Sequence, residues 1–532
     1  MTRCIHCTRC VRFFQDIAGQ EDFGTTLRGK ETEIGTYIGK RLTSELSGNI
    51  IDLCPVGALT SKPYAFTARP WELKSVETID TSDSVGSNIK LSFKETEILR
   101  VLPALNDTLN EEWISDKTRF SFDGLKINRV GQPYASQNGS LKKISWKQAL
   151  EVFSDAFSKN NKKVIICGNN LDLETLELLK VTSENCGIPI VTENYLNDDS
   201  NSMLFSRSNA TFEDILESDL CLTIGTNVRF EAALLNVRLN KRRRRGNFVK
   251  ASIGLAENLN YKNEYLGNSL KTLLDIVEGK HPFCKKLYKA EKPVIILGTS
   301  LKKRVDSKTI ENLITSLSKN CKIVDENWLG INFLPVTPNS VGEAFLGVSQ
   351  NAKVDLSNVN FAYCVGVDFP EKFINKFNKN TFIAVQTPYA SVSLKNVNLI
   401  LPSNAFTEKE GTFLNLEGRL QKTTTALLGP NLARDDRSII KAIWSSLEQI
   451  SANSFKYRNN AENKKLVGDF NENKNSFTKF LLSNKNLGKK KILKTPLKNI
   501  MSDFFMTNAV SKNSLTMAKC SEIFKKNYTN FI

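Results

Sequence analysis

Four cysteines in the first part of the chain have a spacing suited to iron–sulfur chemistry. Two residues separate Cys4 from Cys7 and Cys7 from Cys10. Cys54 follows downstream, directly before a proline. A tight turn with this spacing can bind three irons of a cubane, and a Cys-Pro returned by the fold can bind the fourth. No other Cys occurs before position 167. The pattern predicts one [4Fe–4S] cluster held by these four thiolates.

Other uses of the four thiols fit the spacing less well. A zinc site would more usually have two Cys-x2-Cys pairs, and no second pair follows. Four unrelated thiols would not be expected at this spacing. His6 lies between the predicted ligands and is expected to be a spectator.

Length and composition indicate a large globular protein. The chain has 532 residues, enough for three or four domains, and its 40% hydrophobic and 24% charged residues allow large cores. No run of about 18 apolar residues occurs, so no membrane span is expected. An odd number of Cys, eleven, argues for a reducing compartment rather than a disulfide framework. Neither a signal segment nor a presequence is recognised at the start.

The chain is basic, with a net charge of +17. Part of this charge lies in the run 241–245, which follows an apolar helical stretch. No aromatic residues interleave the run as a stacking platform for nucleic acid would require. A solvated helix end or a contact with an acidic partner is therefore preferred, and no nucleic-acid partner is expected.

The remaining sequence divides by pattern. Alternating stretches at 89–93 and 98–102 predict half-buried strands in a small β-rich region. Beyond residue 130, apolar runs that end in glycine alternate with helical stretches, which predicts a parallel sheet covered on both faces. These strands are expected at 164–168, 220–225, 294–298 and 362–366, with a helix of 230–240 after the second.

Three details refine the α/β region. Asp172 is expected to cap a helix that runs to about Glu184, and Cys167, Cys221 and Cys364 to be buried small hydrophobes. The strand-end glycines could line a binding crevice, but no Gly-x-Gly-x-x-Gly or Walker sequence is present. Residues rich in Asn and Lys then predict a linker, followed by a short amphipathic tail. The expected organisation is 1–62, cluster domain; 73–129, small domain without a cluster; 130–450, α/β domain; 451–495, linker; 496–532, tail.

Several longer motifs resemble one family closely over nearly the whole chain. They are Met1 to Cys10, Ser44 to Asp52, Cys54 to Pro63, Ala68 to Glu72, Asn110 to Lys117, Gly225 to Asn227, Arg229 to Ala232, Glu417 to Arg419 and Thr516 to Cys520. The family is the large iron–sulfur subunit of respiratory complex I, the NADH-quinone oxidoreductase, and the resemblance is to its mitochondrial type.

This resemblance implies a fold and a function. The fold would be a small ferredoxin-like [4Fe–4S] segment, a small β-rich domain and an α/β body similar to molybdopterin-dependent oxidoreductases. The function would be electron transfer from NADH and FMN towards ubiquinone, with Cys4, Cys7, Cys10 and Cys54 matching the ligands of one cluster. As a subunit of an H⁺-translocating NADH:ubiquinone reductase, the chain would have no bond-making site of its own. The body is expected to be structural, without a molybdenum cofactor.

The sequence departs from the family in two places. No Cys lies between Cys54 and Cys167, so the small domain cannot hold the further [4Fe–4S] cluster found in some relatives. The family's usual front segment, with a [2Fe–2S] site and a three-Cys, one-His site, does not precede Met1. The expected partners are therefore other complex I subunits, including the NADH/FMN-binding subunit, and a separate chain that carries the missing segment. The alternative is that the sequence is a fragment of a longer chain that includes this segment.

The resemblance and the composition together give an expected location. It is the matrix-side peripheral arm of complex I in mitochondria. The Asn, Lys, Ile and Phe-rich composition resembles proteins encoded in AT-rich organelle genomes, which would agree with the lack of a presequence.

Two other classes of function remain as alternatives. A stand-alone molybdopterin oxidoreductase would need a metal ligand or an acid/base in the α/β body, yet the chain has only two His and no clustered Cys there. An iron–sulfur nucleic-acid enzyme would rest on the run 241–245 alone.

Overall fold

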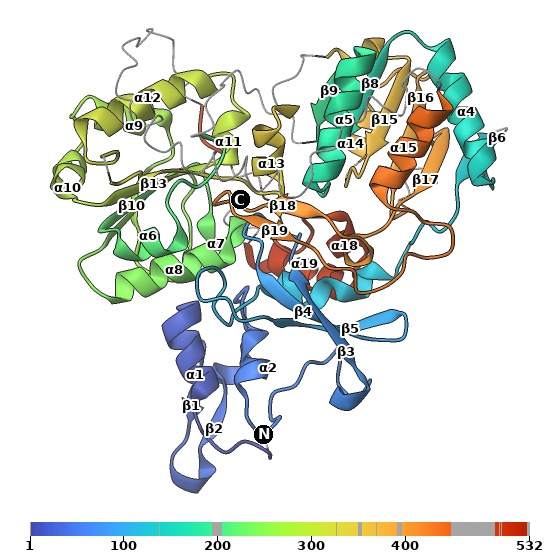
Figure 1. Cartoon of the computed structure of the whole chain (residues 1–532). Helices are drawn as coiled ribbons and strands as arrows, with labels where there is room; N and C mark the ends of the chain where they lie inside the picture. Colours follow the sequence, from blue (N-terminus) through green and yellow to red (C-terminus); the bar gives the residue numbers. More distant parts are fainter. Residues whose placement is uncertain are drawn as a thin grey trace.

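The computed structural model describes residues 2–137, 139–193, 205–325, 327–348, 354–368, 370–390, 396–447, 495–498, 501 and 503–528. A small cluster segment extends from the rest of the molecule, a three-stranded sheet adjoins it, and two α/β lobes lie side by side beyond them (Figure 1). In the described ranges no helix is long and apolar enough to cross a membrane. The predicted linker of 451–495 lies outside the described residues, apart from its last position.

The cluster segment contains little regular structure. Its elements are α1 (Arg9–Phe13), β1 (Phe23–Thr26), β2 (Glu33–Thr36) and α2 (Asn49–Leu53). Strands β1 and β2 form an antiparallel pair. Phe14 packs against Phe23 with ring centroids 5.3 Å apart, and Phe13 packs against Trp113 of the next region at 4.9 Å. A few aromatic side chains therefore form the core of this segment and join it to its neighbour.

The next region is a three-stranded antiparallel sheet, and two of its strands lie where the alternating pattern predicts them. Its elements are β3 (Lys74–Ile79), β4 (Asn88–Lys94), β5 (Glu97–Pro103) and α3 (Asp116–Phe120). Ile89 and Leu91 are buried on one face of β4, whereas Lys90 between them is exposed. This alternation is the reason that the segment forms a half-buried strand.

The α/β region has two sheets, so the expectation of one sheet is wrong. Strands β8 (Lys163–Cys167) and β15 (Phe361–Val365) pair in a seven-stranded sheet of order β7-β6-β17-β16-β15-β8-β9. Strands β10 (Leu220–Ile224) and β13 (Pro293–Gly298) pair in a parallel five-stranded sheet of order β12-β11-β10-β13-β14. The chain enters the first sheet, leaves it to build the second, and then returns. A local apolar pattern predicts each strand but not its partner.

The other elements of the seven-stranded lobe complete this sheet and cover it. They are β6 (Tyr134–Gln137), β7 (Ser140–Lys143), β9 (Ile190–Thr192), β16 (Phe382–Thr387), β17 (Leu399–Pro402), α4 (Trp146–Lys159), α5 (Leu173–Cys186), α13 (Ser340–Phe345), α14 (Glu371–Ile374) and α15 (Asp436–Ser446). Asp172 accepts a hydrogen bond from the Thr175 amide at 3.2 Å, which confirms the predicted cap of α5.

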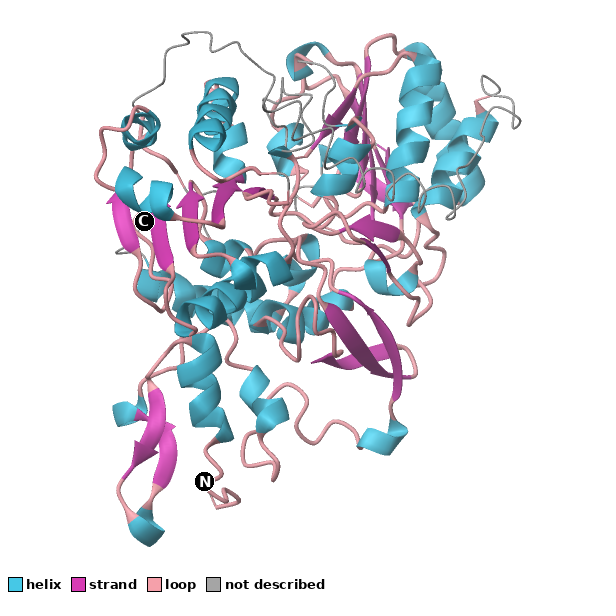
Figure 2. Cartoon of the chain, turned by 60° about the vertical axis from the view of Figure 1, so that its left-hand side comes forward, coloured by secondary structure: helices cyan, strands magenta, loops and turns pink. Residues whose placement is uncertain are grey.

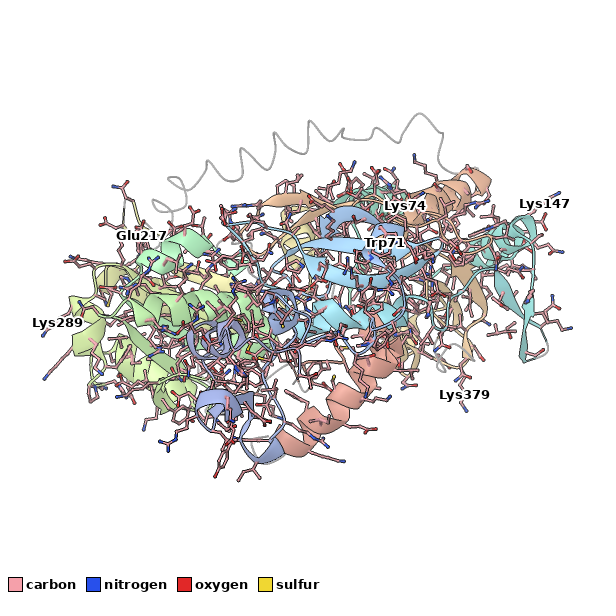
Figure 3. The ribbon with its side chains drawn as sticks, turned by 90° about the horizontal axis from the view of Figure 1, so that it is seen from below. Trp71, Lys74, Lys147, Glu217, Lys289 and Lys379 are labelled. Carbon is pink, nitrogen blue, oxygen red and sulfur yellow. The ribbon has the colours of Figure 1, made fainter. Side chains whose placement is uncertain are left out.

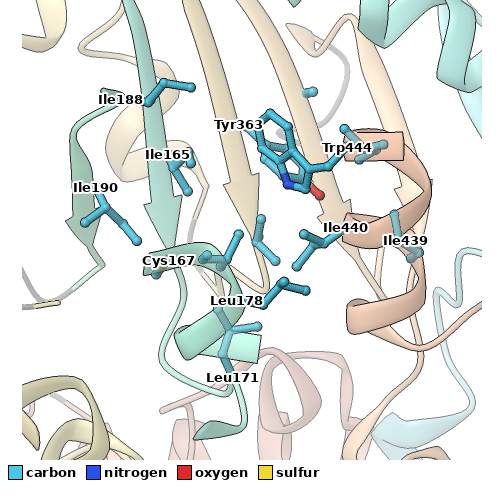
Figure 4. Close-up of a cluster of buried hydrophobic side chains, with 14 of the residues drawn as sticks. Ile165, Cys167, Leu171, Leu178, Ile188, Ile190, Tyr363, Ile439, Ile440 and Trp444 are labelled. Atoms are coloured by element: carbon cyan, nitrogen blue, oxygen red, sulfur yellow. The ribbon is translucent and has the colours of Figure 1, made fainter. Parts of the chain in front are cut away.

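The core of this lobe is close-packed (Figure 4). Tyr363 of β15 and Trp444 of α15 lie over side chains of β8, including Ile165 and Cys167. Phe157 meets Trp444 edge to face, with ring centroids 5.5 Å apart. Cys167, like Cys221 and Cys364, has no exposed surface, which confirms the prediction that these thiols act as small hydrophobes.

The five-stranded lobe follows the same plan. Its other elements are β11 (Val249–Ile253), β12 (Glu264–Gly267), β14 (Ile331–Leu334), α6 (Phe212–Glu217), α7 (Val228–Glu231), α8 (Ala233–Arg244), α9 (Leu270–Val277), α10 (Cys284–Lys289), α11 (Thr299–Lys302) and α12 (Ser307–Asn320). The expected helix of 230–240 is interrupted at Ala232, where the backbone leaves helical geometry, so that two helices form.

The end of the chain returns to the centre of the molecule. Helices α18 (Ala509–Asn513) and α19 (Leu515–Tyr528) lie near the centre of the molecule beside the three-stranded sheet region (Figure 1). The segment with the N-terminus extends away from the rest of the molecule (Figure 2). A short antiparallel pair, β18 (Thr412–Leu414) and β19 (Leu420–Lys422), lies nearby. The Phe504 ring packs against Phe230, and Ser514 hydrogen-bonds Asp123, so the tail contacts both a lobe and the small sheet region.

Candidate metal centre

The structure brings the four predicted ligands to one pocket. Cys4, Cys7, Cys10 and Cys54 line it together with Ile5, Arg9, Ile34, Pro55, Val56, Ala58 and Leu59. Across the described residues, no three Cys, His, Asp or Glu side chains converge as the ligands of a single ion would. In a cubane each thiolate binds a different iron, so the sulfurs surround the cluster rather than one point. Four thiols that line one pocket are the donor set that a cubane uses.

The loop from Cys4 to Cys10 is wound by an unusual backbone. His6 and Thr8 both have left-handed conformations, with φ of 53° and 58°. The His6 amide lies 3.4 Å from the Cys4 sulfur and donates to it. The His6 side chain is exposed and does not line the pocket. A left-handed residue in each gap turns the chain back after each cysteine, which keeps the thiols on one side.

Helix α1 buries the third cysteine. Thr8 precedes the helix, and its carbonyl accepts a hydrogen bond from the Arg12 amide at 3.0 Å. Cys10 is buried beside Val11 and Phe13 on the same helix. Burial raises the pKa of the Cys10 thiol, and the Cys7 and Cys4 sulfurs raise it further, although backbone amides oppose them. The raised pKa favours the neutral thiol at Cys10 in the chain alone.

The fourth cysteine stands at the end of a helix. Helix α2 ends at Leu53, and Cys54 caps it. The Cys54 amide donates to the Ile50 carbonyl at 3.1 Å, and Pro55 prevents continuation. The following residues, 55–60, form a return loop around the sulfur. Burial raises the pKa of the Cys54 thiol, but the backbone amides of Leu59, Val56, Ala58 and Gly57 lower it below its ordinary value. The lowered pKa favours a thiolate at Cys54, the form that binds iron.

Buried polar contacts fix α2 against the sheet region. The Asp116 carboxylate accepts from the Gly48 amide at 2.7 Å and from the Ser47 hydroxyl at 2.5 Å. Asn49 donates to the Ile114 carbonyl at 2.8 Å, and the Ile114 amide donates back to Asn49. Arg119 joins Asn49 to Asp52. These contacts position Cys54 from a neighbouring region, about 60 residues further along the chain.

A second set of contacts ties the cluster segment to the five-stranded lobe. Arg229 of α7 pairs with Glu45 at 2.8 Å, and both side chains are at most 2% exposed. Arg244 pairs with Asp16 at 2.5 Å and donates to the Gln15 carbonyl at 3.1 Å. The motifs around Glu45 and Arg229 contribute to the family resemblance, but their sequence does not identify them as partners. Their opposite charges are the only signal that could have suggested the pair.

The basic run 241–245 serves internal contacts. Lys241 pairs with Glu111 at 2.6 Å, Arg242 stacks on Phe248 and Arg243 stacks on Tyr261, at 5.3 and 5.5 Å from the ring centroids. Together with the Arg244 contacts above, four of the five cations have partners within the chain. The run is thus a helix end whose cations contact neighbouring segments of the same chain, a use that differs from the expected solvated end or acidic partner.

The carboxyl edge of the seven-stranded sheet is closed by the chain itself. A Cβ on Gly168 would lie 1.8 Å from the Gly366 carbonyl oxygen, so these glycines allow adjacent strand ends to touch. The amide of Ala509 in α18 donates to Asp368 at 3.1 Å in the same crevice. The remaining cavity is about 50 Å³, well below the ~300 Å³ at the lower end for ligand pockets. These residues do not fit a large cofactor.

Buried charges fill part of the same crevice. Lys409 pairs with Asp172 at 3.2 Å and with Asp436, and all three side chains are at most 5% exposed. The carboxylates hold the pKa of Lys409 above its ordinary value against the effect of burial. Lys409 therefore stays protonated, and its charge is balanced by two carboxylates of the chain. It is not available for a ligand phosphate or for acid/base chemistry.

Comparison with known sequences places each region in a family. Residues 1–60 match the ferredoxin-like domain of NADH-quinone oxidoreductase subunit 3, and residues 73–123 match the 4Fe-4S domain of NADH-ubiquinone oxidoreductase NDSU1/NuoG-like proteins. Residues 129–446 match molybdopterin oxidoreductase, and residues 472–520 match the C-terminal family of the NADH-ubiquinone oxidoreductase G subunit. The family matched by residues 73–123 is named for a 4Fe-4S domain, although residues 73–123 of this chain contain no Cys.

Several curated proteins are similar over almost the whole chain. The 75 kDa subunit of NADH-ubiquinone oxidoreductase from Reclinomonas americana is 42% identical, over 99% of this chain and 80% of that protein. The mitochondrial 78 kDa subunit of NADH-ubiquinone oxidoreductase from Candida albicans is 40% identical, over 98% and 74%. The mitochondrial NADH dehydrogenase iron-sulfur protein 1 of Solanum tuberosum is 36% identical, over 99% and 72%. The chain therefore belongs to the family of the large iron–sulfur subunit of respiratory complex I.

Proposed function

We propose that Cys4, Cys7, Cys10 and Cys54 hold one [4Fe–4S] cluster, the redox centre of this chain. The chain is an electron-transfer iron–sulfur subunit of complex I, as its family and its ferredoxin-like segment indicate. The observation that carries the ligand proposal is that all four thiols, and no other Cys, line one pocket. Bound there, a cluster would accept and release one electron at a time.

The residues of the pocket have distinct tasks in this function. The amides of the return loop stabilise the Cys54 thiolate, and the His6 amide donates a hydrogen bond to the Cys4 sulfur. The apolar side chains of Ile5, Ile34 and Leu59 limit water at the centre. Arg9 lines the same pocket and places a positive charge beside an anionic cluster, which raises its reduction potential. Cys10 lies on α1 and Cys54 directly follows α2, so both ligands are positioned by helices.

The remainder of the chain is proposed to act as a scaffold. A molybdenum cofactor in the α/β body is not proposed, because the crevice at the strand ends holds only about 50 Å³ and is filled by the chain's own residues. Electrons would then pass through the cluster segment and not through the lobes. A bond-making site is not part of this proposal.

The partners of the chain are other subunits of complex I, and its place is the mitochondrion. More specifically, we propose the matrix-side arm, with the NADH/FMN-binding subunit and a cluster-bearing polypeptide among the neighbours. Exposed apolar side chains of the cluster segment support such contacts: Ile5, which lines the pocket, is 62% exposed, and Ile38 elsewhere in the segment is 84% exposed. A relay also needs a donor and an acceptor within short reach of its single cluster.

Elemental analysis of the full-length chain tests the proposal. Anaerobically reconstituted protein should contain about four irons and four sulfides per chain, the content of one cubane. The complex purified from its source should contain no molybdenum or tungsten that co-purifies with this chain. A content near two irons, or near eight, would contradict the single cubane. Stoichiometric molybdenum would contradict the scaffold role of the body.

A further inference from the structure

A second, larger cavity lies behind the return loop of Cys54. Its volume is about 560 Å³, within the range of pockets that take a ligand or a protein segment. The wall is built from the start of the chain, α2, the return loop, β5 and α3. Ala58 and Leu59 line both this cavity and the cluster pocket. A single stretch of backbone therefore separates whatever enters the cavity from the proposed cluster.

The cavity wall has an excess of positive charge. It contains Arg3, Arg100 and Arg119, and one carboxylate, Asp52. Asp52 is already paired with Arg119 at 2.5 Å. In the part of the chain that the structure describes, no carboxylate pairs with Arg3 or Arg100. The Arg100 guanidinium lies over the Tyr64 ring at 4.9 Å, which orients it without neutralising it.

Aromatic residues stand beside these cations. Phe122 and Tyr64 line the cavity, and Phe66 at its edge is fully exposed. The backbone of Phe66 is left-handed, with φ of 64°, an uncommon conformation for a bulky residue. Hydrogen bonds within the turn fix it, including one from the Tyr64 hydroxyl to the Ala68 carbonyl at 2.9 Å. An aromatic ring held in solvent at the edge of a basic cavity is typical of a contact surface.

We propose that this cavity receives a segment of a neighbouring complex I subunit that carries a carboxylate and an apolar side chain. The carboxylate pairs with Arg100 and Arg3, which have no carboxylate partner in the described part of the chain. The apolar side chain covers Phe66. Charge complementarity and the uncovered ring together select this chemistry. The segment thus lies one loop from the cluster, so the subunit that supplies it is positioned as a neighbour in the electron path. Only this last consequence rests on the proposed cluster.

Zero-length cross-linking in the intact complex tests the docking. An Arg100→Lys variant keeps the positive charge and supplies an amine that a carbodiimide can join to an adjacent carboxylate. Mass spectrometry should identify a bond from position 100 to an Asp, a Glu or a C-terminus of another subunit. The Arg100→Gln variant has no amine, and the bond should be lost. Lys74, an exposed lysine outside the cavity (Figure 3), is the internal control for the carbodiimide reaction, and its reactivity should be the same in both variants.

A second pair of variants tests the apolar contact. In the Arg100→Lys background, Phe66→Ala should reduce the yield of this cross-link about tenfold or more, as loss of an aromatic anchor does. Trp71→Ala removes a ring that is 79% exposed but lies outside the cavity, and it should leave the yield unchanged (Figure 3).

The outcomes separate this proposal from the cluster assignment. A bond from position 100 only to Asp52, or none in an assembled complex, would overturn the docking. The docking would also be overturned if pyrophosphate protected position 100 from chemical modification in the separated chain while no inter-subunit bond formed in the complex. That result would indicate a small-anion site. The electron paramagnetic resonance signal of each variant reports the cluster independently, because none of these substitutions removes a proposed ligand.

Discussion

The cluster segment and the seven-stranded lobe keep their structure by different means. The lobe buries Trp444, Tyr363 and Phe153 almost completely in one core. The cluster segment leaves Leu27, Tyr37 and Ile38 at least 70% exposed and depends on polar ties to other regions. The lobe therefore has a large core of its own, whereas the cluster segment depends more on contacts with neighbouring regions. Under the proposed function, the redox centre lies in the segment with the smaller core.

The largest expected effect is in the lobe. Trp444→Ala should lower the free energy of unfolding by about 3–5 kcal/mol, because a buried indole is lost and a cavity remains. Calorimetry should show unfolding at a lower temperature. The visible spectrum of the cluster, measured below that temperature, should not change. A bleached cluster at temperatures where the lobe is folded would contradict the separation of the two regions.

A smaller but more local effect is expected at the junction. Arg229→Met leaves Glu45 buried without its partner and should cost about 3 kcal/mol. Hydrogen exchange should increase at residues 43–50 more than in the seven-stranded sheet. Lys40→Met, which breaks an ion pair whose lysine is 59% exposed, is the control and should cost less than about 1 kcal/mol. Equal exchange in both variants would argue against Arg229 as the anchor.

The smallest effect concerns pH. Burial raises the pKa of Asp116 to about 6, although Ser47, the Gly48 amide and Arg119 act against it. The folded chain therefore holds a proton there between about pH 4 and 6, when the unfolded chain has released it. This contribution to stability is present below about pH 4 and is lost as the pH rises through 6. Asp116→Asn should remove that part of the pH dependence. The free energy of unfolding of the original chain and of the variant would be measured by denaturation at a series of pH values. Parallel plots of this free energy against pH would refute the prediction.

Much of the fold could be predicted because its signals are local. The apolar run at β8 and the cap at Asp172 depend on neighbouring residues, and both are confirmed. The division into two sheets could not be predicted, since β8 pairs with β15 almost 200 residues later. The same holds for Gly168 and Gly366. Their absent side chains suggested a binding crevice, but the structure uses them for contact between strands.

The candidate site shows the same limit. The spacing of Cys4, Cys7 and Cys10 predicted their common pocket, because a short loop leaves few other arrangements. The position of Cys54 depends on Asp116 and Arg119, which no local pattern connects to it. The basic cavity behind the return loop also combines residues from distant parts of the chain. Pockets of this kind require the tertiary structure.

The most direct test of the account is the cluster itself, with two matched cysteine variants. Cys54→Ser removes a proposed ligand, and Cys186→Ser changes a partly exposed thiol in α5, far from the pocket. Both full-length chains would be reconstituted anaerobically, reduced, and compared by electron paramagnetic resonance and iron content. The account predicts that Cys54→Ser loses the [4Fe–4S] signal or converts it to a form with less iron, whereas Cys186→Ser is unchanged. An intact cubane in Cys54→Ser would contradict the central claim.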